Sequence, residues 1–193
     1  MVSRSSALAP TLAALLLAGA LGPLGSTGAG VRAAETAPSA AEGGRAPKLT
    51  GSDWLNSKPL TRRDLAGKVV LVEFWAFECI NCQRTFPAMK RLQALYGDRG
   101  DVVIVGVHTP ELDREKDPKA VARAVRQNQL PYPVLIDGEW SNWNAFHNQY
   151  WPALYLIDRR GVIRKLHIGE LHEGTPGWSE TVSLVDSLRR EHT

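Results

Sequence analysis

One stretch constrains the fold of this chain more than any other: an apolar run over 68–77 leads directly into the sequence Cys-Ile-Asn-Cys. Alternate side chains of the run point to opposite faces and are apolar on both, which is typical of a central β-strand covered on two sides. After the cysteines, apolar residues recur at helical spacing as far as Tyr96, and Gly97 is expected to end that helix. Cys79 and Cys82 are therefore expected where a buried strand meets the first turn of a helix.

The rest of the chain alternates between strand and helix patterns. Further strands are expected over 101–107, 153–157 and 162–168, the last as an outer antiparallel strand, and further helices over 117–128 and 175–190. Each of these helices has an N-cap residue, Asp117 or Thr175, before a proline that suits the first turn. The alternation predicts an α/β fold, with a mixed and mostly parallel central sheet flanked by helices.

Residues 1–33 are typical of a secretory signal peptide. Arg4 gives a positive start, an apolar segment over 7–21 follows, and small residues lead to a cleavage-like sequence at Val31-Arg32-Ala33. The apolar segment contains Pro10 and is short for a membrane-spanning helix, which needs about 20 residues. An uncleaved membrane anchor is the alternative. We therefore expect a periplasmic or secreted, extracytoplasmic protein, which stays membrane-anchored if the leader is not removed.

The segment over 34–47 contains no large apolar side chain. Such a composition cannot offset the entropy lost on ordering, so a flexible linker is expected there, followed by one domain over 48–193. After removal of a leader containing Arg4 and Arg32, the chain has 21 Lys and Arg against 20 Asp and Glu, a net charge of +1. This near-balance gives no reason to expect a nucleic-acid partner, and we expect a monomer.

The placement of the cysteine pair favours redox chemistry. Free N–H groups and a partial positive charge at a helix start favour the thiolate, which is the form that attacks disulfides. Cys82 follows one turn after Cys79 and should be the less exposed of the two. We therefore expect Cys79 to attack a partner and Cys82 to resolve the mixed disulfide. Outside the cytosol, such a pair can also persist in the oxidised form.

Other uses of two cysteines fit the sequence less well. A zinc site needs two more ligands, and the paired histidines His167 and His172 lie far along the chain. Covalent haem attachment needs a histidine where Gln83 stands, and a peroxiredoxin-like peroxidase would have a threonine in place of Ala76. A purely structural disulfide gains little from closing so short a loop. No metal is expected, and the redox group is the Cys79–Cys82 disulfide itself.

Glu73 interrupts a strand that is otherwise apolar on both faces. In one interpretation, its carboxylate reaches water at a sheet edge. In the other, the carboxylate is buried, loss of hydration raises its pKa, and it accepts the Cys82 proton when that thiol attacks. The residues leave both interpretations open, and Glu73 is a candidate catalytic residue.

The segment Val72–Cys82 (VEFWAFECINC), with Pro87 downstream, resembles the thioredoxin superfamily. Within it, the segment resembles the extracytoplasmic TlpA/ResA (redoxin) type of thiol-disulfide oxidoreductase. The phrases FWAFECINCQR, GVHTPE (106–111) and YWPALYLID (150–158) are similar to the thioredoxin-like domain of DipZ-type cytochrome c biogenesis proteins. The resemblance extends from about Lys48 to the last helix, and it implies a thioredoxin-like fold.

The resemblance implies roles that residue spacing does not give. Glu73 falls at the buried-acid position of the family, and Pro152 falls at the cis-proline that faces the active-site disulfide. Partner contacts are implied for three further residues: Trp151, Ile80 and Asn81. The segment over 54–67 is expected to form an N-terminal β-hairpin extension.

We therefore expect an exported enzyme that exchanges a dithiol and a disulfide with protein partners through Cys79 and Cys82. The resemblance implies a protein-disulfide reductase, with the cysteines of apocytochrome c as one candidate target, but it does not establish the direction of electron flow. DipZ-type proteins fuse this domain to a membrane electron carrier, so a separate membrane electron donor is expected here. A non-catalytic thioredoxin-fold binding module and a thiol peroxidase are the alternatives.

Overall fold

The computed structural model describes residues 40–191, so the predicted signal peptide lies outside the described residues. Within this range no helix is both long enough and apolar enough to cross a membrane. The strands are β1 (Trp54–Leu55), β2 (Val69–Trp75), β3 (Val102–His108), β4 (Val134–Ile136), β5 (Ala153–Ile157) and β6 (Ile163–Ile168). The α-helices are α1 (Arg62–Leu65), α2 (Ile80–Tyr96), α3 (Pro118–Gln127), α4 (Ser141–Ala145) and α5 (Pro176–Arg190), with short 3-10 turns η1 (Gly97–Arg99) and η2 (Asp113–Lys116).

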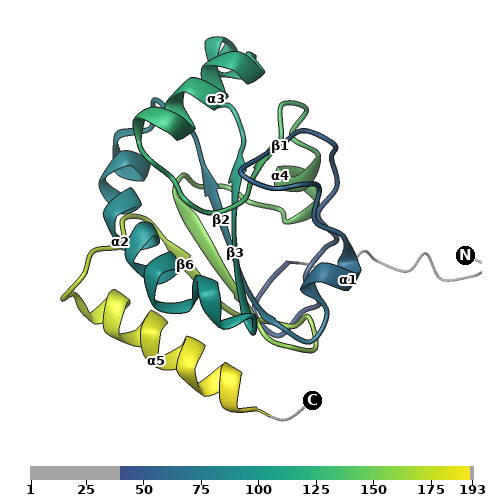
Figure 1. The fold of residues 1–193 in the computed structure, drawn as a ribbon, viewed down its shortest axis with the longest axis vertical. Coiled ribbons are helices and arrows are strands. Elements are labelled where there is room, and N and C mark those ends of the chain that lie inside the picture. Colours follow the sequence, from purple (N-terminus) through teal and green to yellow (C-terminus); the bar gives the residue numbers. More distant parts are fainter. Residues whose placement is uncertain (1–39, 192–193) are drawn as a thin grey trace, which may run out of the picture. The chain divides into compact units, whose positions relative to one another are not determined.

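The strands form one mixed sheet in the order β1-β4-β3-β2-β5-β6 (Figure 1). β2 pairs in parallel with β3, and β3 with β4, whereas the pairs β1–β4, β2–β5 and β5–β6 are antiparallel. The α/β fold and the mixed sheet are confirmed, but the sheet is parallel only at its centre and is not mostly parallel. After β4 the chain passes through α4 to the other side of β2 and enters β5 in the opposite direction.

The two faces of β2 belong to two separate apolar cores, as the sequence predicted. One core joins odd-numbered residues of the strand to α2, α3 and α5, and the other joins even-numbered residues to the α4 region and the segment before β1. Figure 1 shows α2 and α5 on one face of the sheet and α1 and α4 on the other. Every residue of β2 is buried, so the strand that leads to Cys79 is held from both sides.

Several helix ends follow the predicted capping residues. The Asp117 side chain accepts the Lys119 N–H at 2.9 Å at the start of α3. The Thr175 hydroxyl accepts the Trp178 N–H at 3.3 Å at the start of α5. Gly97 is the C-cap of α2. These local contacts satisfy backbone groups that a helix end leaves unpaired, which explains why the sequence predicts the boundaries well.

The predicted β-hairpin over 54–67 is wrong. Its one strand, Trp54–Leu55, pairs with β4 instead of a local partner, and residues 62–65 form a helical turn. The Asp64 carboxylate accepts the Thr61 N–H at 2.7 Å, which is the reciprocal half of a capping box. This contact favours a helix start at the place where a second strand of the hairpin was expected.

Residues 40–47 of the predicted linker contact the domain. Ala40 is buried, and Arg45 forms a β-bridge with Val162. The Gly43 N–H donates to the Ile163 carbonyl at 2.7 Å. The backbone of this segment thus pairs beside the start of the outer strand β6, whereas its composition had indicated only a flexible tether.

Candidate functional site

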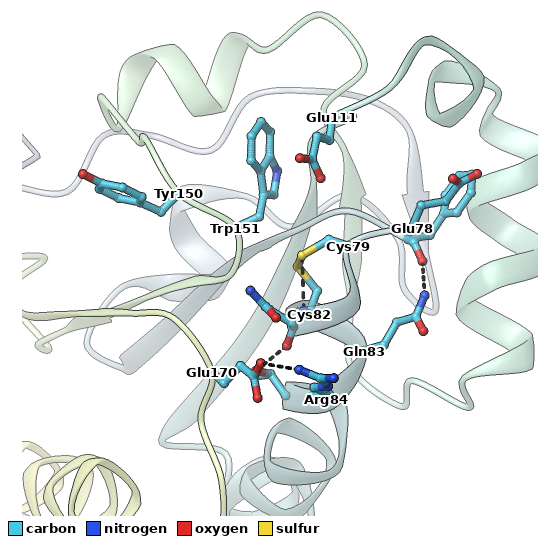
Figure 2. Close-up of a disulfide and its surroundings, with 12 residues drawn as sticks. Glu78, Cys79, Cys82, Gln83, Arg84, Glu111, Tyr150, Trp151 and Glu170 are labelled. Carbon is cyan, nitrogen blue, oxygen red and sulfur yellow. Dashed lines mark hydrogen bonds and ion pairs between the residues drawn. A yellow bond between two sulfur atoms is a disulfide. The ribbon is translucent and has the colours of Figure 1, made fainter.

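Cys79 and Cys82 form a disulfide at the amino-terminal end of α2 (Figure 2). Their Cα atoms are 5.2 Å apart, and Cys79 is the N-cap residue of the helix. The Cys79 Sγ accepts the backbone N–H of Cys82 at 3.2 Å. The structure therefore joins the two predicted cysteines where β2 leads into α2.

The two cysteines differ in exposure. Cys79 keeps 9% of its surface exposed and Cys82 keeps none. The positive end of α2 favours a thiolate at the N-cap position. Cys79 is thus the more accessible of the two cysteines, and Cys82 is fully buried.

The dipeptide between the cysteines faces solvent. Ile80 is 56% exposed, and Asn81 is also exposed. The Asn81 carbonyl accepts the Thr85 hydroxyl at 3.0 Å, which fixes the backbone of this first turn. Both residues stand beside the disulfide in a position to contact a partner.

A loop that begins at Tyr150 runs beside the disulfide. The Trp151–Pro152 peptide bond is cis, and the Pro152 carbonyl accepts the Gly169 N–H at 2.9 Å. Gly169 has a φ of 92°, in the left-handed region that favours glycine. Figure 2 shows Trp151 next to Cys79. The structure thus gives Pro152 the cis geometry, and Trp151 the place, that the resemblance implied.

The Trp151 ring is held by groups that the sequence did not mark as functional. Its Nε1 donates to the Thr109 carbonyl at 3.1 Å, and the ring stacks on Trp143 with centroids 4.0 Å apart. The buried Asp137 carboxylate accepts the Thr109 hydroxyl at 3.0 Å and the Trp143 N–H at 2.9 Å. One buried carboxylate therefore positions both supports of Trp151. An aspartate before a glycine reads as an ordinary turn residue, so no local signal marked this role.

Glu73 is buried in the middle of β2, and the interpretation as an edge carboxylate is wrong. The residue is 1% exposed, and its Oε2 accepts the Tyr132 hydroxyl at 3.1 Å. Burial raises the pKa of Glu73 from 4.5 to about 8, although the Tyr132 hydrogen bond acts in the opposite direction. Glu73 belongs to the odd-numbered residues of β2, so it lies on the face of the sheet that α2 covers. A carboxyl group that is protonated near neutral pH therefore lies on the side of Cys82.

His108 ends β3 on the same face of the sheet. It pairs with Trp75 across the strands, and its ring stacks on Phe77 with centroids 5.5 Å apart. It is fully buried, and neither ring nitrogen has a hydrogen-bond partner within residues 40–191. Burial lowers the pKa of His108 from 6.5 to about 3, so the ring is neutral at physiological pH.

The turn before Cys79 is tied to the loop that follows β3. The fully buried Glu115 accepts the Glu78 N–H at 2.8 Å through Oε1, and the Glu111 and Leu112 N–H groups through Oε2. The Glu78 side chain forms an ion pair with Arg114, which lowers the pKa of Glu78. The negative charge next to Cys79 is therefore paired. The role of Glu115 depends on Glu78, which lies far away in sequence, so no local pattern indicates it.

These groups can exchange electrons with another dithiol or disulfide. A thiolate at the Cys79 position can attack a disulfide, and the adjacent Cys82 can then displace the attached sulfur and close the internal bond. The cis-proline loop and the exposed first turn of α2 border the reacting sulfur. The arrangement suits thiol-disulfide exchange with a protein partner.

Comparisons with known proteins agree with this chemistry. A family model described as Redoxin matches residues 41–183. Protein DipZ of Mycobacterium tuberculosis is 44% identical over 131 residues, which are 66% of this chain and 19% of DipZ. The chain therefore spans about a fifth of the length of that relative. The thiol-disulfide oxidoreductase YkuV of Bacillus subtilis is 32% identical over 125 residues, 64% of this chain and 82% of YkuV.

A crystal structure of a thioredoxin-like superfamily protein has the same fold. Its TM-score is 0.69 at 25% sequence identity, and the match covers 77% of this chain and 98% of that one. The family match includes the disulfide, the buried acid and the cis-proline loop. The chain belongs to the Redoxin family of thiol-disulfide oxidoreductases, and its domain has the thioredoxin-like fold.

Proposed function

We propose that this protein is an exported protein-disulfide reductase that acts on extracytoplasmic protein cysteines. The observation that carries the proposal is the pair at the start of α2, in which Cys79 is the accessible member and Cys82 is fully buried. Export is supported by the signal-peptide pattern over residues 1–33. The resemblance to DipZ-type domains supports apocytochrome c as a target.

In the proposed reaction, the dithiol form attacks a partner disulfide. The Cys79 thiolate bonds to one partner sulfur, and the other partner sulfur leaves as a thiolate that takes a proton. Cys82 then gives up its proton and attacks the Cys79 Sγ, which releases the second partner thiol and closes the Cys79–Cys82 disulfide. The partner gains two electrons and two protons, and this protein loses them. A thiol donor must then restore the dithiol.

Glu73 in its ionised form is proposed as the acceptor of the Cys82 proton. With a pKa of about 8, a minority of folded molecules carry this form near neutral pH, and its share grows as the pH rises. With a pKa raised to about 8, its carboxyl group matches a thiol, whose ordinary pKa is about 8.5, far better than an exposed glutamate would. Its position on the α2 face of a central strand supports this role. In that case the buried acid assists the resolving step and not the first attack.

The roles of the two cysteines are tested by trapping. Cys82→Ser should accumulate a mixed disulfide with a model protein disulfide through Cys79, because the resolving sulfur is missing. Cys79→Ser should form no such adduct, because the remaining sulfur is buried. Adducts are measured by non-reducing electrophoresis and mass spectrometry. Trapping by Cys79→Ser alone would refute the assignment.

The direction of electron flow is tested by equilibrating the pair with a thiol-disulfide buffer. A potential of about −270 mV, the thioredoxin value, supports a reductant, whereas one of about −120 mV, the DsbA value, contradicts it.

A further inference from the structure

We propose that the loop Glu111–Lys116, called here the acidic lip, selects partners that carry a Lys or Arg next to their reactive sulfur, and that Glu111 binds this basic side chain. The proposal rests on the disulfide-exchange function proposed above. It adds a charge requirement to the partner, and the residues that carry it are outside the cysteine pair and the cis-proline loop.

The buried carboxylate of Glu115 fixes the acidic lip to the active-site turn. Glu115 accepts the N–H groups of Glu111 at 2.7 Å, Leu112 at 2.8 Å and Glu78 at 2.8 Å. Glu78 immediately precedes Cys79. A buried carboxylate that accepts three backbone hydrogen bonds from both segments fixes the position of the lip relative to the disulfide. The lip therefore has a fixed position at the border of the site before a partner binds.

The segment that leads into the lip is fixed to the cis-proline loop. The Thr109 carbonyl, two residues before Glu111, accepts the Trp151 Nε1–H at 3.1 Å. The Thr109 N–H donates to the Trp75 carbonyl at 3.0 Å, which ties the same segment to β2. Glu111 therefore lies between two fixed points, one next to Cys79 and one at Trp151. Figure 2 shows its carboxylate beside the Trp151 indole, on the side of the disulfide.

The apolar groups around the disulfide indicate a surface that a partner covers. Among residues 40–191, the exposed large hydrophobic side chains all belong to segments that border this site. Leu112 is on the lip, Ile80 lies between the cysteines, Tyr150 precedes Trp151, and Ile168 precedes Gly169. Exposed apolar side chains in the segments that flank a reactive group suit contact with a protein partner. The lip adds Leu112 to that surface.

Charge balance indicates what the partner must bring to this surface. Glu78 is paired with Arg114, and Glu170 is paired with Arg84 and His172. Glu111 is exposed and forms no ion pair with any residue of the described range. The Glu111 carboxylate lies beside the Trp151 indole (Figure 2). A Lys or Arg side chain can form an ion pair with the carboxylate and pack against the indole ring. The unmatched charge is therefore complementary to a basic residue.

The test compares two synthetic peptides, each with one internal disulfide, that differ only in a Lys or a Glu next to the first cysteine. The reduced protein is mixed with each peptide in stopped flow, and the second-order rate constants of reduction are measured. We expect the Lys peptide to react about two- to fivefold faster at low salt, as an exposed ion pair allows. The ratio should approach one at high salt, because salt screens exposed charges. Glu111→Gln should bring the ratio to about one at low salt.

Asp98→Asn is the matched control, because Asp98 is an exposed carboxylate in η1, at the far end of α2 from the disulfide. It should keep the ratio of the parent. The lip proposal is wrong if the parent reduces the two peptides at equal rates, or if Glu111→Gln leaves the ratio unchanged. Neither outcome contradicts the proposed disulfide reduction. If the parent reduces neither peptide nor neutral 2-hydroxyethyl disulfide, the proposed function fails, and the lip proposal falls with it.

Discussion

Glu73 and His108 lie on the same face of adjacent strands, and burial acts on their charges in opposite directions. The pKa of Glu73 rises from 4.5 to about 8, so the folded protein keeps a proton that the unfolded chain has lost. The pKa of His108 falls from 6.5 to about 3, so between these pH values His108 is neutral in the folded protein and protonated in the unfolded chain. Stability thus falls as pH rises toward 8 because of Glu73, and falls as pH drops toward 3 because of His108.

Glu73→Gln should remove the loss of stability on the alkaline side. Between about pH 6.5 and 8, the oxidised parent should lose on the order of 2 kcal/mol of unfolding free energy, because Glu73 is ionised only in the unfolded chain. The variant should show no such loss. It should lose stability below pH 6.5 through His108, a loss that Glu73 offsets in the parent down to about pH 4.5. Urea unfolding at a series of pH values measures both slopes. A variant that declines as steeply as the parent above pH 6.5 contradicts the assignment.

At the scale of elements, the close fit of β2 and β3 depends on Gly106. This glycine pairs with Glu73, and a Cβ added to it would lie 2.8 Å from the Trp75 Nε1 and 3.1 Å from the Tyr132 Cε2. Gly106→Ala should therefore displace the indole or the phenol that bonds Glu73, at a cost of about 1–3 kcal/mol of unfolding free energy. Urea unfolding measures the loss.

Gly138→Ala is the control for that substitution. A Cβ at Gly138 meets no heavy atom within 4 Å among the described residues, and the backbone there is not left-handed. Its unfolding free energy should stay within about 0.5 kcal/mol of the parent. Equal losses in the two variants would mean that crowding against Trp75 and Tyr132 is not the cause.

The elements that the sequence predicted well are those specified by their own residues. β2 and β5 have continuous apolar runs, and α3 and α5 begin at capping residues followed by proline. The shorter elements depend on the rest of the fold. β1 is a strand because β4 offers it an edge, and Asn142 in α4 donates its side-chain N–H to the Thr50 carbonyl at 2.7 Å. Local patterns carry no information on such distant partners.

At the scale of the whole molecule, the site gathers segments that are far apart in the chain. The place of the cysteine pair could be predicted because strand, turn and helix are consecutive. The residues left the burial of Glu73 open, and only the family resemblance implied it. Trp151 and Pro152 required a family resemblance, since a cis peptide bond leaves no mark in residue spacing. Glu115, Thr109 and Asp137 could not be predicted, because each acts through a contact with a segment tens of residues away.

The same architecture places the reacting bond at one end of the sheet, at the border of one of the two apolar cores. The disulfide closes a loop with a sequence separation of only 3, so breaking it releases little chain entropy. β2 is buried on both faces and bonded to a strand on each side, without help from that bond. The fold should therefore survive each redox cycle without loosening.

Amide hydrogen exchange of the reduced and oxidised forms tests this separation. We expect changes in rate to be confined to residues 77–83, 109–116 and 150–152, which contact the disulfide or support its neighbours. The amides of β2, β3 and β5 should keep their protection, because their opening requires disruption of both cores. Gly106→Ala, which crowds the core directly, shows in the same experiment how a loosened sheet exchanges. Faster exchange throughout β2 and β3 on reduction would mean that the disulfide holds the sheet together, and the separation of chemistry from stability would be wrong.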